Sequence, residues 1–377
     1  MKELANFNEK KLGFGCMRLP VIDGDMERID DALFCKMIDT FMEQGFTYFD
    51  TAYPYHNQKS EGAVKRCLVD RYAREKFYLA DKMPMWAVKE YADYERIFAE
   101  QLERCGVAYF DFYLLHALYG ERYEEGVKLG AFDFVQKMKA EGKIKHIGFS
   151  FHDTADVLDK ILSEHPEMEF VQLQINYYDW ESENVQSRKC YEVAVKHGVP
   201  VIVMEPVKGG SLVEIPEEAQ KIFDDLGGGS NASYAIRFAA SFDNMMMVLS
   251  GMSNMEQMED NISYMKDFKS LSEEEFEAVF KVRDIINAQG LIPCTACKYC
   301  MDVCTQKIAI PDLFSDLNAK TIHDNWNSAW YYGIHTKNAG KASDCIKCGK
   351  CEKVCPQHLG IRELLVEVAE AFEKEEE

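Results

Sequence analysis

Short apolar segments alternate with amphipathic segments along the chain from residue 12 to about residue 268. Polar residues or glycines bound the apolar segments, which is typical of strands buried in a parallel sheet. We predict strands at Leu12–Gly15, Thr47–Asp50, Phe77–Lys82, Phe110–His116, Lys145–Ser150, Phe170–Asn176, Val199–Glu205 and Met245–Ser250.

Helical spacing of apolar residues predicts helices between these strands. A glycine often follows the helical pattern, as in Gln44-Gly45 and Cys105-Gly106, where it supplies the left-handed cap that ends a helix. Roughly eight strand–helix units over ~250 residues predict a parallel (β/α)8 barrel rather than an open sheet. The clearest helical segments are Ala32–Gln44, Tyr91–Cys105, Phe132–Ala140 and Val185–His197.

The C-terminal region carries a second kind of pattern, a doubled cysteine motif. Eight of the 13 cysteines lie between Cys294 and Cys355, and C-x2-C-x2-C-x3-C occurs there twice. This spacing resembles that of bacterial ferredoxins with two [4Fe–4S] clusters, in which the fourth cysteine of each motif ligates the other cluster. Two zinc sites are the alternative, but zinc is usually held by two separated pairs of ligands. The resemblance implies two ligand sets: Cys294, Cys297, Cys300 with Cys355, and Cys345, Cys348, Cys351 with Cys304.

The remaining five cysteines are scattered through the barrel region. We expect them to be small, reduced core residues, because thiols stay reduced in an intracellular protein. They are Cys16, Cys35, Cys67, Cys105 and Cys190.

These patterns divide the chain into three parts. We predict an α/β barrel over residues 1–270, a linking helix within residues 271–290, and a mainly helical ferredoxin-like iron–sulfur domain over residues 291–377. The linking helix is predicted at Ser272–Ala288, where acidic residues occupy the first turn, and a final helix is predicted from about Ile361.

The charge of the chain limits its partners. A formal net charge of −21 argues against binding nucleic acid or an anionic membrane surface. The first 15 residues lack the apolar stretch of a signal peptide, and no apolar run is long enough to span a bilayer. We therefore expect a cytoplasmic protein.

A motif after the second strand points to a particular chemistry. The segment Phe49-Asp50-Thr51-Ala52-Tyr53-Pro54-Tyr55, continued by Ser60-Glu61-Gly62, resembles the signature of the aldo/keto reductases. The resemblance implies a catalytic tetrad whose members lie at or just after strand C-terminal ends, where barrel active sites are built. In this chain the tetrad is Asp50, Tyr55, Lys82 and His116.

The tetrad is chemically coherent. Reduction of a carbonyl needs a hydride on carbon and a proton on oxygen, and a phenol is normally too weak an acid near neutral pH. A nearby ammonium lowers the pKa of a phenol, so we expect Lys82 to assist Tyr55 and Asp50 to hold Lys82. His116 would orient the carbonyl or share the proton. Each residue alone has an ordinary structural explanation, but four in one frame favour an active site.

The same resemblance implies a nicotinamide cofactor, NAD(H) or NADP(H). Gly251 and Gln257 stand where members that bind the 2′-phosphate often carry Lys and Arg, so we expect NAD(H) to bind at least as well as NADP(H). A basic residue from another loop could supply the missing positive charge for the 2′-phosphate. The nicotinamide contacts implied are Ser150, Gln172 and Met204, and the adenosine contacts are Gly251, Ser253, Gln257 and Asn261.

Two kinds of function fit these features. One is an oxidoreductase acting on a small carbonyl or alcohol, with clusters that serve a ferredoxin or flavodoxin. The other is an electron-transfer or redox-sensing protein whose barrel binds nucleotide without significant turnover. In either case the clusters could also have a purely structural role. A flavin could link hydride and one-electron chemistry, but the chain shows no flavin fingerprint.

Four lysines that could steer an acidic partner surround the second motif: Lys341, Lys347, Lys350 and Lys353.

The cysteine motifs predict a metal content. Protein purified without oxygen should contain about eight iron and eight sulfide per chain, with a brown absorption that bleaches with dithionite. Iron and sulfide analysis checks this. Stoichiometric zinc without sulfide would contradict it.

Overall fold

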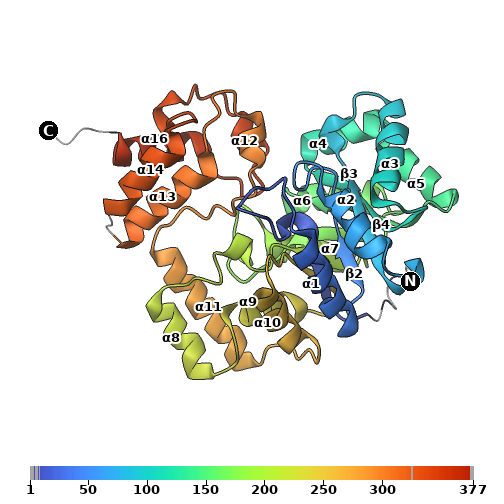
Figure 1. The fold of residues 1–377 in the computed structure, drawn as a ribbon, viewed down its shortest axis with the longest axis horizontal. Helices are drawn as coiled ribbons and strands as arrows, with labels where there is room; N and C mark the ends of the chain where they lie inside the picture. Colours follow the sequence, from blue (N-terminus) through green and yellow to red (C-terminus); the bar gives the residue numbers. More distant parts are fainter. Residues whose placement is uncertain (1–3, 5–6, 8, 324–325, 374–377) are drawn as a thin grey trace. The chain divides into compact units, whose positions relative to one another are not determined.

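The computed structural model describes residues 4, 7, 9–323 and 326–373. Within these residues eight parallel strands form one closed barrel in chain order, and β1 pairs with β8 (Figure 1). The strands are β1 (Leu12–Gly15), β2 (Tyr48–Asp50), β3 (Tyr78–Met83), β4 (Phe110–Leu118), β5 (Ile144–Phe151), β6 (Phe170–Gln174), β7 (Val201–Met204) and β8 (Met245–Ser250).

The barrel predicted from the sequence is confirmed, and the strands differ from the predicted ranges only near their ends. The core includes a cluster with Tyr48, Phe112, Phe170 and Met247, all of them fully buried. The largest difference is at β7, which ends before Glu205. Glu205 has a φ of +55°, so the chain leaves the extended conformation there.

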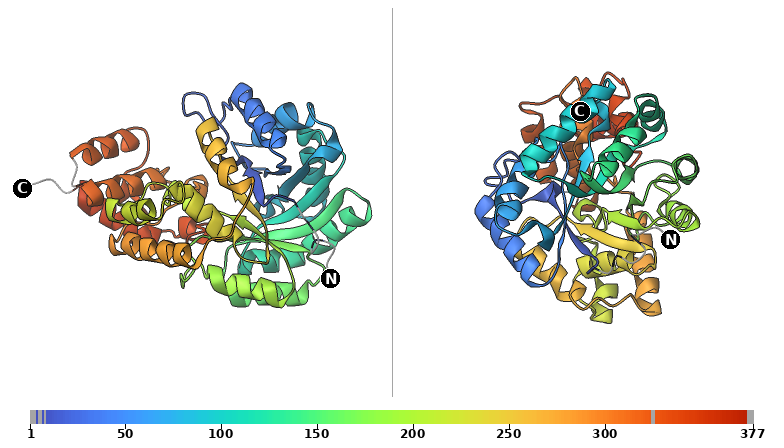
Figure 2. Two further views of the ribbon diagram at one scale, coloured as in Figure 1. Left: turned by 90° about the horizontal axis from the view of Figure 1, so that it is seen from below. Right: turned by 90° about the vertical axis from the view of Figure 1, so that its right-hand side faces the viewer.

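Helices form the outer layer around the strands, as Figures 1 and 2 show. In the part of the chain that is described, no helix combines the length and apolar character needed to cross a membrane. The helices are α1 (Asp31–Glu43), α2 (Ser60–Val64), α3 (Tyr91–Cys105), α4 (Gly120–Lys128), α5 (Ala131–Ala140), α6 (Ala155–Glu164), α7 (Ser187–Lys196), α9 (Asn231–Ala240) and α10 (Met255–Met265).

The chain forms two compact units, and each unit contains two separate stretches of the sequence. The first contains Met1–Pro206 and Gly228–Phe276, and the second contains Val207–Gly227 and Glu277–Glu377. The segment after β7 therefore belongs to the unit that carries the cysteine motifs. Helix α11 (Glu273–Ala288) begins in the first unit and continues into the second.

The second unit is mainly helical and has its own apolar core. Ile310, Leu313 and Phe314 pack there with Leu365 and Val368, and all five are buried. The helices of this unit besides α11 are α8 (Glu217–Leu226), α12 (Tyr299–Val303), α13 (Ile310–His323), α14 (Trp326–Thr336), α15 (Lys350–Lys353) and α16 (Ile361–Phe372).

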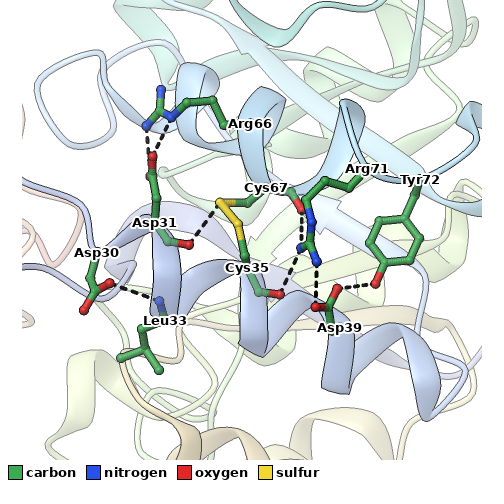
Figure 3. The surroundings of a disulfide bond; sticks show 9 residues. All are labelled: Asp30, Asp31, Leu33, Cys35, Asp39, Arg66, Cys67, Arg71 and Tyr72. Atoms are coloured by element: carbon green, nitrogen blue, oxygen red, sulfur yellow. Dashed lines mark hydrogen bonds and ion pairs between the residues drawn. A yellow bond between two sulfur atoms is a disulfide. The ribbon is translucent and has the colours of Figure 1, made fainter.

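Two of the scattered cysteines form a disulfide, which corrects our expectation that all five are reduced. Cys35 on α1 is bonded to Cys67 in a π-helical turn, with the Cα atoms 4.7 Å apart (Figure 3). The pairing depends on packing of α1 against this turn, where Arg66 also forms an ion pair with Asp31. The other three scattered cysteines, Cys16, Cys105 and Cys190, are free and buried, as expected.

The disulfide should stabilise the first unit. It closes a loop with a sequence separation of 32 residues, and Cys35→Ser should lower the free energy of unfolding of the oxidised protein by about 2–4 kcal/mol. Urea unfolding with and without a thiol reductant measures this. The reductant should destabilise the wild type but leave the variant unchanged, and a wild type insensitive to it would refute the prediction.

Candidate functional site

The structure brings the four tetrad residues together at one end of the barrel. Asp50 ends β2, Lys82 lies near the end of β3, and His116 lies in the C-terminal part of β4. Tyr55 lies in the turn between β2 and α2. The pairing of Asp50 with Ala80 and of Lys82 with Leu114 aligns these strand ends, so the side chains come from neighbouring strands.

Lys82 is the centre of this group. Its Nζ donates hydrogen bonds to a carboxylate oxygen of Asp50, to the carbonyl oxygen of Thr51 at 2.8 Å and to Oη of Tyr55 at 3.3 Å. The Lys82 side chain is 0% exposed, so its ammonium is neutralised by Asp50 rather than by water. The Tyr55 and His116 rings lie edge to face with their centroids 6.2 Å apart.

Burial governs the protonation of these groups. It raises the pKa of Tyr55 well above its usual value, and the nearby Asp50 carboxylate adds to the effect. This net direction is opposite to our expectation for a phenol beside Lys82, and it means that Tyr55 keeps its proton at neutral pH. Burial lowers the pKa of His116 well below its usual value, with Lys82 as the next cause, so the imidazole is neutral.

A buried polar network outside the tetrad holds the Lys82 backbone. Oδ1 of Asp81 accepts a hydrogen bond from the Lys82 N–H at 2.8 Å, and Nε2 of Gln101 donates to the Lys82 carbonyl at 3.0 Å. Glu61, from the signature segment, pairs with Arg104 at 3.1 Å. Burial raises the pKa of both Asp81 and Glu61, and Asp81 is raised further by the charge of Glu61.

His116 and Trp86 lie side by side next to the tetrad. Nδ1 of His116 is buried and has no hydrogen-bond partner among the described residues, as expected for a group that binds a ligand. The Trp86 ring is 5.2 Å from the His116 ring, and the side chain of this large aromatic is 40% exposed. Our sequence analysis missed Trp86, although its place in the loop directly after β3 was an available signal.

The expected nicotinamide contacts lie near the tetrad but have partners of their own. Nε2 of Gln172 donates to Oδ2 of Asp50 at 3.2 Å, and Oγ of Ser150 accepts from the N–H of Ala117 at 2.7 Å. Ser150 and Gln172 are register partners on β5 and β6. Met204 ends β7 and is partly exposed, so its side chain can contact a bound ring.

The expected adenosine contacts lie in the first part of α10 and in the loop before it, where Asn254 caps the helix. Oε1 of Gln257 accepts from the N–H of Ser253 at 2.7 Å, and Oγ of Ser253 donates to the carbonyl of Arg18 at 2.9 Å. Asn261 is buried, and its amide donates to Oγ of Ser250 at 2.8 Å. A Cβ at Gly251 would lie 3.2 Å from the Cβ of Arg18, so a basic side chain from another loop lies against this position.

Four cysteines from both motifs line one small cavity in the second unit. Its wall also contains Thr295, Gln357 and the apolar side chains of Ile310, Phe314 and Ile361. A buried, sulfur-lined space with apolar walls fits an iron–sulfur cluster. The cysteines are Cys294, Cys297, Cys300 and Cys355.

The other four cysteines line a second cavity. Apolar residues such as Ile308 and Leu365 share its wall with Lys350 and Arg362. In the described residues no three His, Cys, Asp or Glu side chains converge as ligands of one metal ion. The cysteines are Cys304, Cys345, Cys348 and Cys351, so the structure groups the eight residues as the motif resemblance implies.

Two family models match the chain in succession. The model of the aldo/keto reductase family matches residues 11–284, and that of a 4Fe-4S dicluster domain matches residues 293–360. The first match covers the barrel with its tetrad, and the second contains all eight clustered cysteines.

Individual relatives resemble the barrel part. An aldo-keto reductase of Mycolicibacterium vanbaalenii is 26% identical over 65% of this chain and 82% of its own length. An aldo-keto reductase of Mycobacterium avium is 24% identical over 71% of this chain and 87% of its own length. A Klebsiella pneumoniae aldo-keto reductase, solved in complex with NADPH, shares the fold with a TM-score of 0.59 at 19% identity, over 72% of this chain and 90% of its own.

Removing one partner of the buried Lys82–Asp50 pair should destabilise the protein more than removing both partners. Lys82→Met leaves a buried carboxylate without its cation and should lower the free energy of unfolding by about 3–5 kcal/mol. Adding Asp50→Leu should recover a large part of this loss. Because burial raises the pKa of Asp50 in the folded state, the effect of Lys82→Met alone should decrease as the pH falls and the carboxyl is protonated.

Urea unfolding of the two variants measures these changes. Lys36→Met, on the exposed face of α1, is the matched control and should change stability by less than about 0.5 kcal/mol. Equal destabilisation by the single and the double variant would show that the pair is not the source of the effect.

Proposed function

The chain belongs to the aldo/keto reductase family, and on that premise we propose that its barrel interconverts a small carbonyl compound and the corresponding alcohol with a nicotinamide cofactor. The observation that carries the proposal is the convergence of Lys82 on both Asp50 and Tyr55 at the open end of the barrel. The protein is an oxidoreductase of the aldo/keto reductase type.

Each tetrad residue has a distinct task in this proposal. A nicotinamide cofactor, when bound, would supply the hydride for the carbonyl carbon. Tyr55, protonated at neutral pH, donates its Oη proton to the carbonyl oxygen. Lys82 then stabilises the phenolate that remains, at 3.3 Å, and Asp50 accepts a hydrogen bond from Lys82 and holds it in place.

His116 and Trp86 would position the substrate. A neutral imidazole retains one N–H, which can donate a hydrogen bond to the carbonyl oxygen without competing for the transferred proton. Trp86 offers an exposed aromatic face 5.2 Å from that imidazole. These features favour an uncharged carbonyl with an apolar substituent.

The cofactor preference stays a prediction. Gly251 and Gln257 carry no charge for a 2′-phosphate, which favours NAD(H), whereas Arg18 lies against Gly251 and is a candidate to supply a cation. The Klebsiella pneumoniae relative was solved with NADPH. The remaining proposed contacts of the nicotinamide cofactor are Ser150, Gln172, Met204, Ser253 and Asn261.

We further propose that each sulfur-lined cavity holds one [4Fe–4S] cluster. The two cavities, each lined by three cysteines of one motif and one of the other, support this assignment. A nicotinamide exchanges two electrons as hydride, while a cluster passes one, and the tetrad moves only a proton. The clusters would therefore serve a separate carrier such as a ferredoxin or flavodoxin.

The test compares variants of the two halves. Tyr55→Phe removes the proton donor and should lower kcat for carbonyl reduction by about 10²–10⁴-fold while dithionite still reduces the clusters. Tyr53→Phe is the control, because Tyr53 is a neighbouring tyrosine that contacts Glu100 rather than the tetrad. Steady-state turnover with a panel of aldehydes and ketones is the measurement.

Cys300→Ala should damage the clusters yet spare carbonyl reduction. A folded Cys300→Ala protein that binds nucleotide but has lost all turnover would show that the halves are obligatorily coupled. Absence of turnover in the wild type with every carbonyl would favour a nucleotide-binding electron-transfer protein instead.

A further inference from the structure

The main chain of Lys82 extends beyond the end of the neighbouring strand β2. This strand ends one residue before Thr51, whose N–H still donates to the Ala80 carbonyl at 3.0 Å. Residues two apart in a strand direct their backbone groups to the same edge, so the N–H and C=O of Lys82 face that edge after β2 has ended. Side chains replace the missing strand there: Oδ1 of Asp81 accepts from the Lys82 N–H at 2.8 Å, and Nε2 of Gln101 donates to the Lys82 carbonyl at 3.0 Å.

The carboxyl group that holds this N–H is itself buried against a second carboxyl group. Asp81 and Glu61 are both 0% exposed, and their side chains are in hydrogen-bonding contact. Such a bond needs a proton on one of the two groups, because a carboxylate only accepts. With both groups ionised, Oε1 of Glu61 is a buried acceptor without a hydrogen-bond donor among the described residues. A proton on Asp81 supplies that donor.

The surroundings of the pair also favour a retained proton. In the described part of the chain, Arg104 is the cation that contacts the pair, 3.1 Å from Oε2 of Glu61, and it lies 3.6 Å from Glu100 as well. The Lys82 ammonium forms its own ion pair with Asp50. Two adjacent carboxylates shielded from water disfavour ionisation of both. Other ionisable groups near the pair are thiols and phenols whose pKa is raised by burial, so they are uncharged at neutral pH: Cys16, Tyr55, Cys105 and Tyr113.

We propose that Asp81 and Glu61 share one proton at neutral pH and that protonated Asp81 is a positioning residue for Lys82. The carbonyl oxygen of the acid, Oδ1, holds the Lys82 N–H, while its O–H donates to Glu61. Sγ of Cys105 donates to the other oxygen, Oδ2, at 3.7 Å.

The pair connects the end of β3 to the outer layer of the barrel, because Glu61 lies in α2 and Cys105 ends α3. It thereby helps to fix the ammonium that lies 3.3 Å from Oη of Tyr55. The positioning role rests on the proposed carbonyl chemistry, whereas the shared proton does not.

Asp81→Asn tests the shared proton. Its amide oxygen can still accept from the Lys82 N–H, and its amide N–H replaces the acid O–H as the donor to Glu61. Because burial raises the pKa of both carboxyl groups, the folded wild type binds the proton more tightly than its unfolded chain does. The stability of the wild type should therefore fall relative to Asp81→Asn as the pH rises above the ordinary carboxyl pKa of about 4.

Urea unfolding of the intact chain without oxygen, from about pH 5 to about pH 8, measures this difference. Asp267→Asn, at an exposed turn after α10, is the matched control and should follow the wild type at every pH. Infrared spectra at neutral pH should show the C=O band of a protonated carboxyl group in the wild type and in the control but not in Asp81→Asn. Parallel pH profiles of the wild type and Asp81→Asn, or a wild type without this band, would overturn the shared proton.

The positioning role is tested by Asp81→Leu, which removes both the acceptor for Lys82 and the donor to Glu61. It should lower kcat for carbonyl reduction by about 10–100-fold and change KM by less than about threefold, because it disturbs the proton-transfer geometry and not the substrate contacts. Asp81→Asn should restore most of the lost kcat. An unchanged kcat in Asp81→Leu, or an equal loss in both variants, would overturn the role.

Two further outcomes are decided by the same measurements. If Asp81→Leu does not fold, Asp81→Asn alone decides: a kcat within about tenfold of the wild type supports the positioning role, and a larger loss overturns it. A wild type that turns over no carbonyl compound would defeat the proposed reaction. It would leave the unfolding and infrared tests of the shared proton intact.

Discussion

A single ammonium ion without access to water determines how the open end of the barrel is arranged. Lys82 is tolerated at 0% exposure because Asp50, the Thr51 carbonyl and Tyr55 together replace its hydration. These partners come from the end of β2 and the turn that follows it, and the backbone of Lys82 is held in turn by Asp81 and Gln101. The position of the reactive phenol is therefore a consequence of satisfying one buried charge.

The second unit also contains a buried lysine. Lys208 is also buried; its Nζ donates a hydrogen bond to the amide oxygen of Gln357, and Gly209 of the same turn is packed against Thr295. In the barrel, the buried cation faces a carboxylate.

The strands, the tetrad and the grouping of the cysteines could be predicted from the sequence because each depends on a local sequence pattern. Buried parallel strands appear as apolar runs, so the strand predictions differ from the structure only at ends such as Glu205, where a positive φ stops the strand. The tetrad residues lie in the C-terminal part of a strand or, in the case of Tyr55, just after one, and barrel geometry brings strand ends together. The cysteines group in the structure as their spacing implies.

Other features depend on contacts between distant segments and leave no local pattern. The Cys35–Cys67 disulfide arises from the packing of α1 on a π-helical turn, and the Lys208–Gln357 bond joins residues 149 positions apart. The pKa of Tyr55 is raised rather than lowered, because burial and the Asp50 carboxylate act on it, and neither effect can be read from the local sequence.

The division of the chain has a consequence for how such a protein could arise in evolution. Because Val207–Gly227 belongs to the unit with the cysteine motifs, that unit is assembled from two separate stretches of the gene. A ferredoxin-like segment appended to the end of an arbitrary barrel would lack the glycine turn on which Thr295 packs. A junction near residue 276 would therefore separate two stretches that form one compact unit.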